Sequence, residues 1–204
     1  MNLNPFLSVW TQPKETIRQF IDHDKLTYSI ILVSIAGIAG ILTSLQDSGW
    51  FQNLSPAVWV FGILIAGIIS GFLNIGINSL LYTFIGKLYG GQGNLRDMAI
   101  AIGPMMIPQI YTLPILVMYV LIYGERFFAA PADFNFSSMP VGPALLLLLM
   151  IILASIWSTV ISSKGIGIVH GFSSWRGFGV FITVIALYVL IALLVGVAIL
   201  MFLI

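Results

Sequence analysis

The chain has 204 residues, of which 59% are hydrophobic and only 7% are charged, whereas roughly 25% of the residues in an ordinary soluble domain are charged. Eight basic and seven acidic side chains cannot cover the surface of a soluble fold of this length, so the composition excludes soluble, fibrous and disordered classes and predicts an integral membrane protein. The net charge is +1, and the sequence contains no basic tract of the kind that binds nucleic acid. The lack of cysteine excludes disulfides and thiolate sites.

The segment 1–26 precedes the first apolar run and contains acidic residues, which is not the pattern of a cleavable signal peptide. Thr11 is placed to cap a helix that continues through Pro13, and Ile17 and Phe20 then recur at helical spacing on one side. This pattern predicts a short amphipathic helix on the inner surface of the membrane. A flexible cytoplasmic tail is the alternative.

Five uncharged runs are each long enough for a membrane span, which needs about 20 apolar residues. The predicted spans are 27–45, 57–87, 98–123, 143–162 and 178–202. The second run is 39 residues long, which is too short for two spans and a turn, so we expect one long helix that begins near Pro56. The predicted fold class is therefore all-α: a polytopic bundle over 27–204 with five transmembrane helices and a short N-terminal interfacial helix.

The second span carries a stripe of small and polar residues, which fall within about 80° of one another around a helix. They are Gly67, Gly71, Asn74, Asn78 and Tyr82. The two glycines allow another helix to approach closely, and asparagine is costly against lipid, so the stripe is expected to face other helices. Packing with interhelical hydrogen bonds is the preferred interpretation, and a ligand or conduction role is the alternative.

The third span contains three prolines, each of which removes a backbone donor and bends a helix. Pro104, Pro108 and Pro114 lie close to the polar residues Gln109 and Tyr111. The carbonyl groups that the prolines leave free must find partners, or the segment must line a cavity. A packing kink is the preferred interpretation, and a broken helix of the kind found in transporters is the alternative.

The fourth span ends with hydroxyl residues on one face and Trp157 near the membrane edge. A glycine-rich loop is predicted to follow at 165–177, and it contains His170, Trp175 and Arg176. One histidine near serines is ordinary in such a loop, and the chain has neither an HExxH nor a GxSxG motif. We therefore predict no catalytic, cofactor or metal site and no enzymatic activity.

Seven of the eight Lys and Arg residues fall in the N-terminal segment and in the loops 87–97 and 163–177, and Arg126 alone falls on the other side. This bias predicts a cytoplasmic N-terminus and an external C-terminus in the plasma membrane. No ionisable residue lies deep in a span, which argues against proton relays. Arg126 is expected to form an exposed ion pair with Glu125.

Several stretches of the chain resemble the Yip family of membrane proteins, and in particular its bacterial branch. They are Asn4-Pro5-Phe6, Trp10-Thr11-Gln12-Pro13, Thr16-Ile17-Arg18, Gly93-Asn94-Leu95-Arg96-Asp97, Ala101-Ile102-Gly103-Pro104, Ile107-Pro108, Ile156-Trp157, and Val169-His170-Gly171-Phe172-Ser173 with Trp175-Arg176. The acidic-aromatic motif that precedes the first span in the eukaryotic branch is missing, so binding of Rab GTPases does not carry over.

The resemblance implies a five-span bundle with a cytoplasmic N-terminus and the role of a membrane adaptor. In the bacterial branch it also points to association with an ABC-type exporter and to protection against membrane-active peptides. The expected partners are therefore the lipid bilayer, other membrane proteins such as an ABC-type transporter, or a second copy of the chain. The alternative function is a small permease or channel that uses the stripe of the second span and the proline-broken third span.

Overall fold

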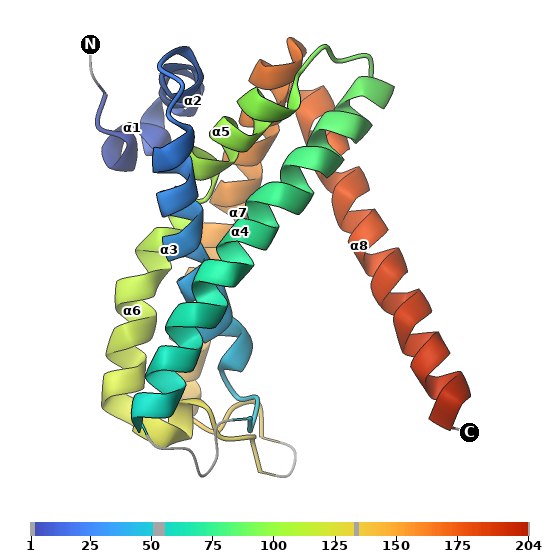
Figure 1. Ribbon diagram of the computed structural model, residues 1–204. Helices are drawn as coiled ribbons and strands as arrows, with labels where there is room; N and C mark the ends of the chain where they lie inside the picture. The colour runs from blue at the N-terminus through green and yellow to red at the C-terminus, as the bar shows by residue number, and fades with distance from the viewer. Residues whose placement is uncertain (1–2, 51–55, 133–134, 204) are drawn as a thin grey trace.

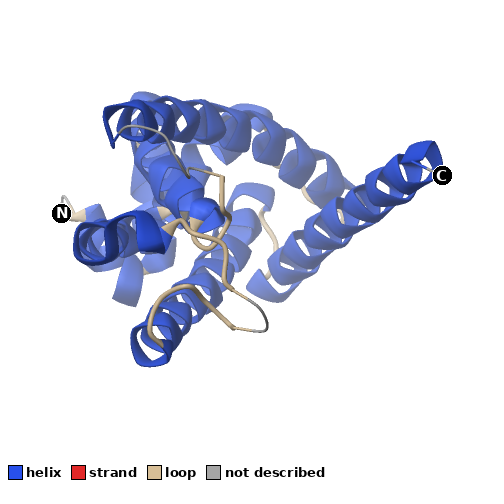
Figure 2. Ribbon diagram, turned by 90° about the horizontal axis from the view of Figure 1, so that it is seen from below, coloured by secondary structure: helices blue, strands red, loops and turns tan. Residues whose placement is uncertain are grey.

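The computed structural model describes residues 3–50, 56–132 and 135–203, and in these ranges all regular elements are helices (Figures 1 and 2). They are α1 (Pro5–Thr11), α2 (Pro13–Asp22), α3 (Leu26–Leu45), α4 (Pro56–Leu88), α5 (Leu95–Met105), α6 (Ile107–Tyr123), the 3-10 turn η1 (Gly124–Phe127), α7 (Val141–His170) and α8 (Ser174–Leu203). Five helical segments are long and apolar enough to cross a membrane, with α5, α6 and η1 forming one of them. The predicted all-α fold with five long apolar segments is therefore confirmed.

Helix α3 lies at the centre of the bundle and contacts α4, α5 and α6 (Figure 1). Its crossing with α4 is close because glycines meet there: a Cβ atom on Gly71 would lie 2.5 Å from the carbonyl oxygen of Val33, and one on Gly67 would lie 2.6 Å from the Cα of Ile38. Glycine is needed on α4 because any larger side chain would force the two backbones apart.

The N-terminal amphipathic helix is present, and protein rather than lipid covers its apolar face. Ile17 and Phe20 of α2 are 0% and 1% exposed and belong to the main buried cluster. Helix α2 contacts α5 and α7, and the side chain of Ile17 lies beside Gly165 of α7. The segment therefore forms part of the bundle and is not a flexible tail.

The predicted capping role of Thr11 is wrong. Thr11 is the last residue of α1, and Gln12 is the N-cap of α2, directly before Pro13. The sequence pattern did not include a separate first helix, which begins at Pro5 because the side chain of Asn4 accepts a hydrogen bond from the backbone N–H of Phe6.

The third apolar segment is broken at Met106, between α5 and α6. Pro104 lies inside α5 and has no N–H group to donate to the carbonyl of Ile100, four residues earlier. The hydroxyl of Ser29 on α3 donates to that carbonyl at 2.6 Å, so the bond lost within the helix is replaced by a bond between helices. Pro108 then lies in the first turn of α6, where proline is tolerated.

The predicted loop at 165–177 is wrong, because α7 continues to His170 and α8 begins at Ser174. Gly165 and Gly167 are helical. Met105 packs against Gly165 and the backbone of Phe172 packs against Gly167, so a larger residue would not fit at either position. The residue that ends α7 is Gly171, whose φ of +71° is a left-handed conformation that favours glycine.

At the opposite end, Asp47 joins the segment after α3 to the segment before α7. Its carboxylate accepts hydrogen bonds from the hydroxyl of Ser137 at 3.1 Å and from the backbone N–H of Ser138 at 2.9 Å. The expected ion pair between Glu125 and Arg126 is wrong, because the Arg126 guanidinium donates to the carbonyl of Ser138. Adjacent residues of a helical turn point in different directions, which keeps these two side chains apart.

Helix α8 packs against the bundle over its first half only (Figures 1 and 2). Gly177, Val180 and Val184 are buried, whereas all residues from Tyr188 to Phe202 are exposed. The hydrogen bond from the Tyr188 hydroxyl to Asn78 at 3.2 Å joins α8 to α4 at the start of this exposed stretch. The outer half of α8, which we define as 189–202, therefore lies apart from the other helices.

Candidate functional site

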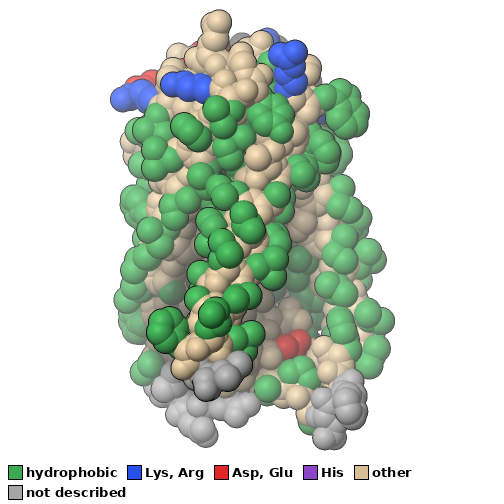
Figure 3. Space-filling view, turned by 90° about the vertical axis from the view of Figure 1, so that its right-hand side faces the viewer, with side chains coloured by type: hydrophobic (Ala, Val, Ile, Leu, Met, Phe, Trp, Pro, Cys, Tyr) green, Lys and Arg blue, Asp and Glu red, His purple; other side chains and the backbone are tan. Residues whose placement is uncertain are grey.

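The basic side chains gather at one end of the molecule, which we call the basic end (Figure 3). It is formed by α1, α2, the α4–α5 connection and the α7–α8 connection, and its basic residues are Lys14, Arg18, Lys25, Lys87, Arg96, Lys164 and Arg176. The sides of the molecule between the two ends carry mainly hydrophobic side chains (Figure 3). This distribution places the chain's charges where they remain hydrated when the bundle crosses a bilayer.

Arg96 and Asp97 stabilise the local structure of the basic end. The Arg96 guanidinium donates two hydrogen bonds to Asp24, at 2.6 and 3.0 Å, and thereby joins α5 to the turn before α3. Those hydrogen bonds hold the pKa of the Asp24 carboxyl below its usual value. Asp97 exchanges hydrogen bonds with Asn94, the N-cap of α5, at 2.9 and 2.7 Å. Both side chains of the Arg96–Asp24 ion pair are more than half exposed, so the contribution of this pair to stability is small.

An aromatic cluster fixes α1 on the bundle. Trp10 stacks on Trp157 of α7, with ring centroids 6.2 Å apart, and meets the ring of Tyr111 edge-on at 5.3 Å. The Tyr111 hydroxyl donates to the backbone carbonyl of Phe6 at 3.1 Å. Two residues predicted as candidate contacts, Tyr111 and Trp157, are thus brought together by the N-terminal segment.

His170 is an almost completely buried polar side chain of the basic end, with 3% exposure. The backbone N–H of Gly93 donates to Nδ1 at 3.1 Å, so the proton of the ring lies on Nε2, which donates to the carbonyl of Tyr82 at 3.0 Å. Three glycines contact the ring so closely that a Cβ atom on any of them would overlap it: Gly86, Gly91 and Gly93. We call this arrangement the His170 junction, and it joins the ends of α4 and α7 to the connection before α5.

The sequence indicates His170 as a candidate contact, but the role of the glycines that surround it was not predicted. Their signal is visible as a cluster, because glycines at 86, 90, 91 and 93 surround the end of α4. Both ring nitrogens are engaged by backbone groups, which is the arrangement of a structural histidine rather than of a general base. Among the described residues, no three His, Cys, Asp or Glu side chains gather as a metal ion would require.

The polar stripe of α4 faces two helices, α3 and α8. Its glycines contact α3, whereas Asn78 accepts a hydrogen bond from Tyr188 of α8, and the ring of Tyr82 stacks on Phe181 of α8 with centroids 6.3 Å apart. Asn74 lies between these two contacts, and its side-chain oxygen is buried without a hydrogen-bond partner in the described structure. The stripe therefore serves two helices and leaves one polar group unpaired.

Trp175 and Arg176 are separated from the other candidates. They lie in the first turn of α8, where Trp175 is 82% exposed and contacts Phe178 edge-on. An exposed tryptophan beside an arginine at the end of an apolar helix is typical of the membrane–water interface. These two residues are available to a lipid headgroup or to a protein partner.

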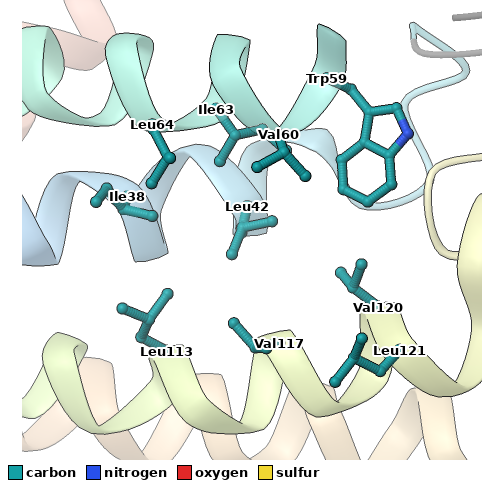
Figure 4. A pocket seen from close by; sticks show the side chains of 10 residues that line it. All are labelled: Ile38, Leu42, Trp59, Val60, Ile63, Leu64, Leu113, Val117, Val120 and Leu121. Carbon is teal, nitrogen blue, oxygen red and sulfur yellow. The ribbon is translucent and has the colours of Figure 1, made fainter. Parts of the chain in front are cut away.

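An apolar pocket of about 340 Å³ opens between α3, α4 and α6, away from the basic end (Figure 4). Its labelled side chains are Ile38, Leu42, Trp59, Val60, Ile63, Leu64, Leu113, Val117, Val120 and Leu121. All lining side chains except that of Trp59 are aliphatic, so the pocket suits a lipid chain.

The family comparison agrees with this geometry of docked N-terminal helices and five apolar segments. No curated protein and no solved structure matches the chain. The model of the Yip1 domain matches residues 7–197, which extend from α1 to the outer half of α8 and include the His170 junction. A match over nearly the whole chain shows that this membrane protein belongs to the Yip1 domain family.

Proposed function

We propose that the chain is a non-enzymatic adaptor of the plasma membrane, which binds other membrane proteins or a second copy of itself. One observation carries the proposal: every residue of the outer half of α8 is exposed, although this segment is as apolar as the packed helices. A helix that leaves its own bundle offers a long surface to the helix of a partner.

The composition of this surface supports a helical partner. Lipid is as apolar as leucine, so helices associate in a bilayer where small residues permit close contact. Ala192 and Gly196 are one turn apart on the exposed half of α8, and a Cβ atom on Gly196 would meet nothing within 4 Å. The surface is therefore free for a second helix.

The basic end supplies the second contact surface of the proposed adaptor. Its exposed residues Leu88, Trp175 and Arg176 come from the adjoining ends of α4 and α8. By the distribution of Lys and Arg, this end faces the cytoplasm, with the N-terminus inside and the C-terminus outside. An acidic segment of a partner would complement its charge.

Photo-crosslinking from defined positions tests the adaptor. A photoreactive residue replaces Leu193 in the outer half of α8 or, as the control, Leu149 on α7; the two side chains are 62% and 52% exposed. In native membranes we expect position 193 to give a discrete protein adduct, which is lost when Gly196→Leu is added. Position 149 is expected to give lipid adducts and no protein adduct. Lipid adducts alone from both positions would refute association through α8.

The resemblance to the bacterial branch makes an ABC-type exporter the first partner to test, together with protection against membrane-active peptides. The adduct from position 193 would then contain a subunit of the exporter, and Gly196→Leu would lower survival in the presence of such a peptide. If survival falls equally when Leu149→Ala is introduced, the peptide phenotype does not depend on α8.

A small permease is the second candidate function, and the break of α5–α6 beside the unpaired Asn74 favours it. Discontinuous helices with polar groups near the bilayer midplane are typical of substrate sites in transporters. Proteoliposomes with a panel of neutral solutes would test it. Uptake that Asn74→Leu abolishes would favour the permease, and the absence of uptake for every solute would remove it.

A further inference from the structure

A cavity of about 140 Å³ lies where α3 and α4 cross, beside the break between α5 and α6. Gly37 and Gly40 of α3 leave room for it, and its polar lining consists of Ser70, Asn74 and Gln109. Asn74 lies near the middle of α4, and Gln109 lies near the middle of the α5–α6 segment. The cavity is therefore at the depth of the bilayer midplane when the bundle spans a membrane.

The three polar side chains of the cavity share an unusual property: none makes a side-chain hydrogen bond to the described part of the chain. Two other hydroxyls in the same helices bond to their own backbone. Ser34 donates to the carbonyl of Ile30 at 2.9 Å, and Ser79 donates to that of Gly76 at 3.0 Å. Buried polar atoms without a partner also occur on Thr83, Trp157 and Ser158, but at the cavity three unpaired polar side chains line one space.

Such a cluster is unstable in an empty apolar environment. A buried polar group without a hydrogen bond costs on the order of 1–3 kcal/mol, and no bulk water reaches the hydrocarbon core to compensate for it. The side-chain oxygen of Asn74 is such a group, and the half-buried side chains of Ser70 and Gln109 line the same cavity, so the space favours a polar occupant. The space is adequate, because a water molecule occupies about 30 Å³ in the liquid, so the cavity has room for several.

We propose that this cavity is a binding site for water, held by hydrogen bonds to Ser70, Asn74 and Gln109 in the middle of the membrane. The ligand is uncharged, because the lining contains no acidic or basic side chain and an unpaired ion is very costly at this depth. The inference does not depend on the adaptor proposal, which rests on α8. The apolar pocket of Figure 4 provides the contrast, since all its lining side chains except that of Trp59 are aliphatic.

Radiolytic hydroxyl labelling in water enriched in ¹⁸O tests the site, because radicals formed from bound water oxidise side chains beside it. Met106 lines the cavity, whereas the adjacent Met105 is fully buried and lies outside its lining. In nanodiscs we expect Met106 to gain the label several-fold faster than Met105. Equal, slow labelling of the two methionines would show that the cavity is dry and overturn the proposal.

A pair of variants identifies the groups that hold the water. Asn74→Leu with Gln109→Leu removes two of the polar groups and fills the space, so the excess labelling of Met106 is expected to disappear. Ser34→Ala removes a hydroxyl bonded to its own helix and is expected to leave the labelling unchanged. Unchanged labelling of Met106 in the double variant would show that these side chains do not hold the water. A change in the labelling when Na⁺ replaces choline as the cation of the buffer would show that the ligand is an ion, and would overturn the assignment of an uncharged ligand.

Discussion

At the scale of single residues, His170 shows how one side chain connects three parts of the chain. Its two nitrogens bind backbone groups of Gly93 and Tyr82, which lie before α5 and within α4. The neighbouring glycines pack closely against the ring, and Phe172 stacks on it with centroids 5.3 Å apart. The imidazole is therefore held in one tautomer and one orientation.

We expect His170→Ala to destabilise the folded protein by about 2–4 kcal/mol, because it leaves the N–H of Gly93 without its acceptor and opens a cavity among closely packed glycines. His23→Ala is the control, since His23 is exposed at the end of α2. Thermal unfolding in detergent, followed by tryptophan fluorescence, measures both. Equal unfolding temperatures for the two variants would contradict the structural role of His170.

At the scale of elements, glycine decides how closely helices pack. A Cβ atom on Gly71 would meet the α3 backbone, but one on Gly76, five residues later in the same helix, would meet nothing within 4 Å. The sequence identified Gly71 through its spacing from Gly67 and its place in the polar stripe. It did not reveal that α3 was the partner, because spacing within a helix contains no information about the neighbouring helix.

The two glycines make a matched pair of variants. Gly76→Ala is expected to be neutral or slightly stabilising, because alanine favours a helix by about 1 kcal/mol over glycine. Gly71→Ala has the same propensity gain, yet we expect a net loss of about 1–3 kcal/mol from forcing α3 and α4 apart. Unfolding in a denaturant series distinguishes them, and a Gly71→Ala protein as stable as Gly76→Ala would refute the close crossing.

Helix α7 extends further than the predicted fourth span. The start of α7 was predicted within a few residues, but its end was placed too early because Lys164 and several glycines suggested a loop. Lysine near a helix end can extend its ammonium to water, and glycine within a helix can serve close packing. Only contacts with Met105 and Phe172 distinguish those glycines from loop residues.

At the scale of the whole molecule, the two ends differ in chemistry. The basic end carries the docked helices α1 and α2 and most of the chain's positive charge, whereas the opposite end is closed by the hydrogen bonds of Asp47. The outer half of α8 extends toward that opposite end without a partner in the described bundle (Figure 1). The two proposed contact surfaces therefore lie at different depths: the basic end at the membrane surface and the outer half of α8 within the bilayer.

The proposed orientation can be measured directly, because the chain has no cysteine. Single cysteines replace Lys14 on α2 and Asn135 before α7, both of which are exposed. In intact cells we expect a membrane-impermeant maleimide to label position 135, and to label position 14 only after permeabilisation. The reverse pattern would place the basic end outside.

The sequence by itself determined the class of protein, its five apolar segments and the presence of an amphipathic N-terminal helix. A bilayer requires a minimum number of consecutive apolar residues without charged ones, and this requirement can be read from the local sequence. Only the tertiary structure decided what covers that helix, how the stripe of α4 is shared between α3 and α8, and why His170 is surrounded by glycines. It also decided that Ser70, Asn74 and Gln109 meet in one cavity. These features join residues distant in sequence, and their energies depend on which groups meet across helices, which no local pattern contains.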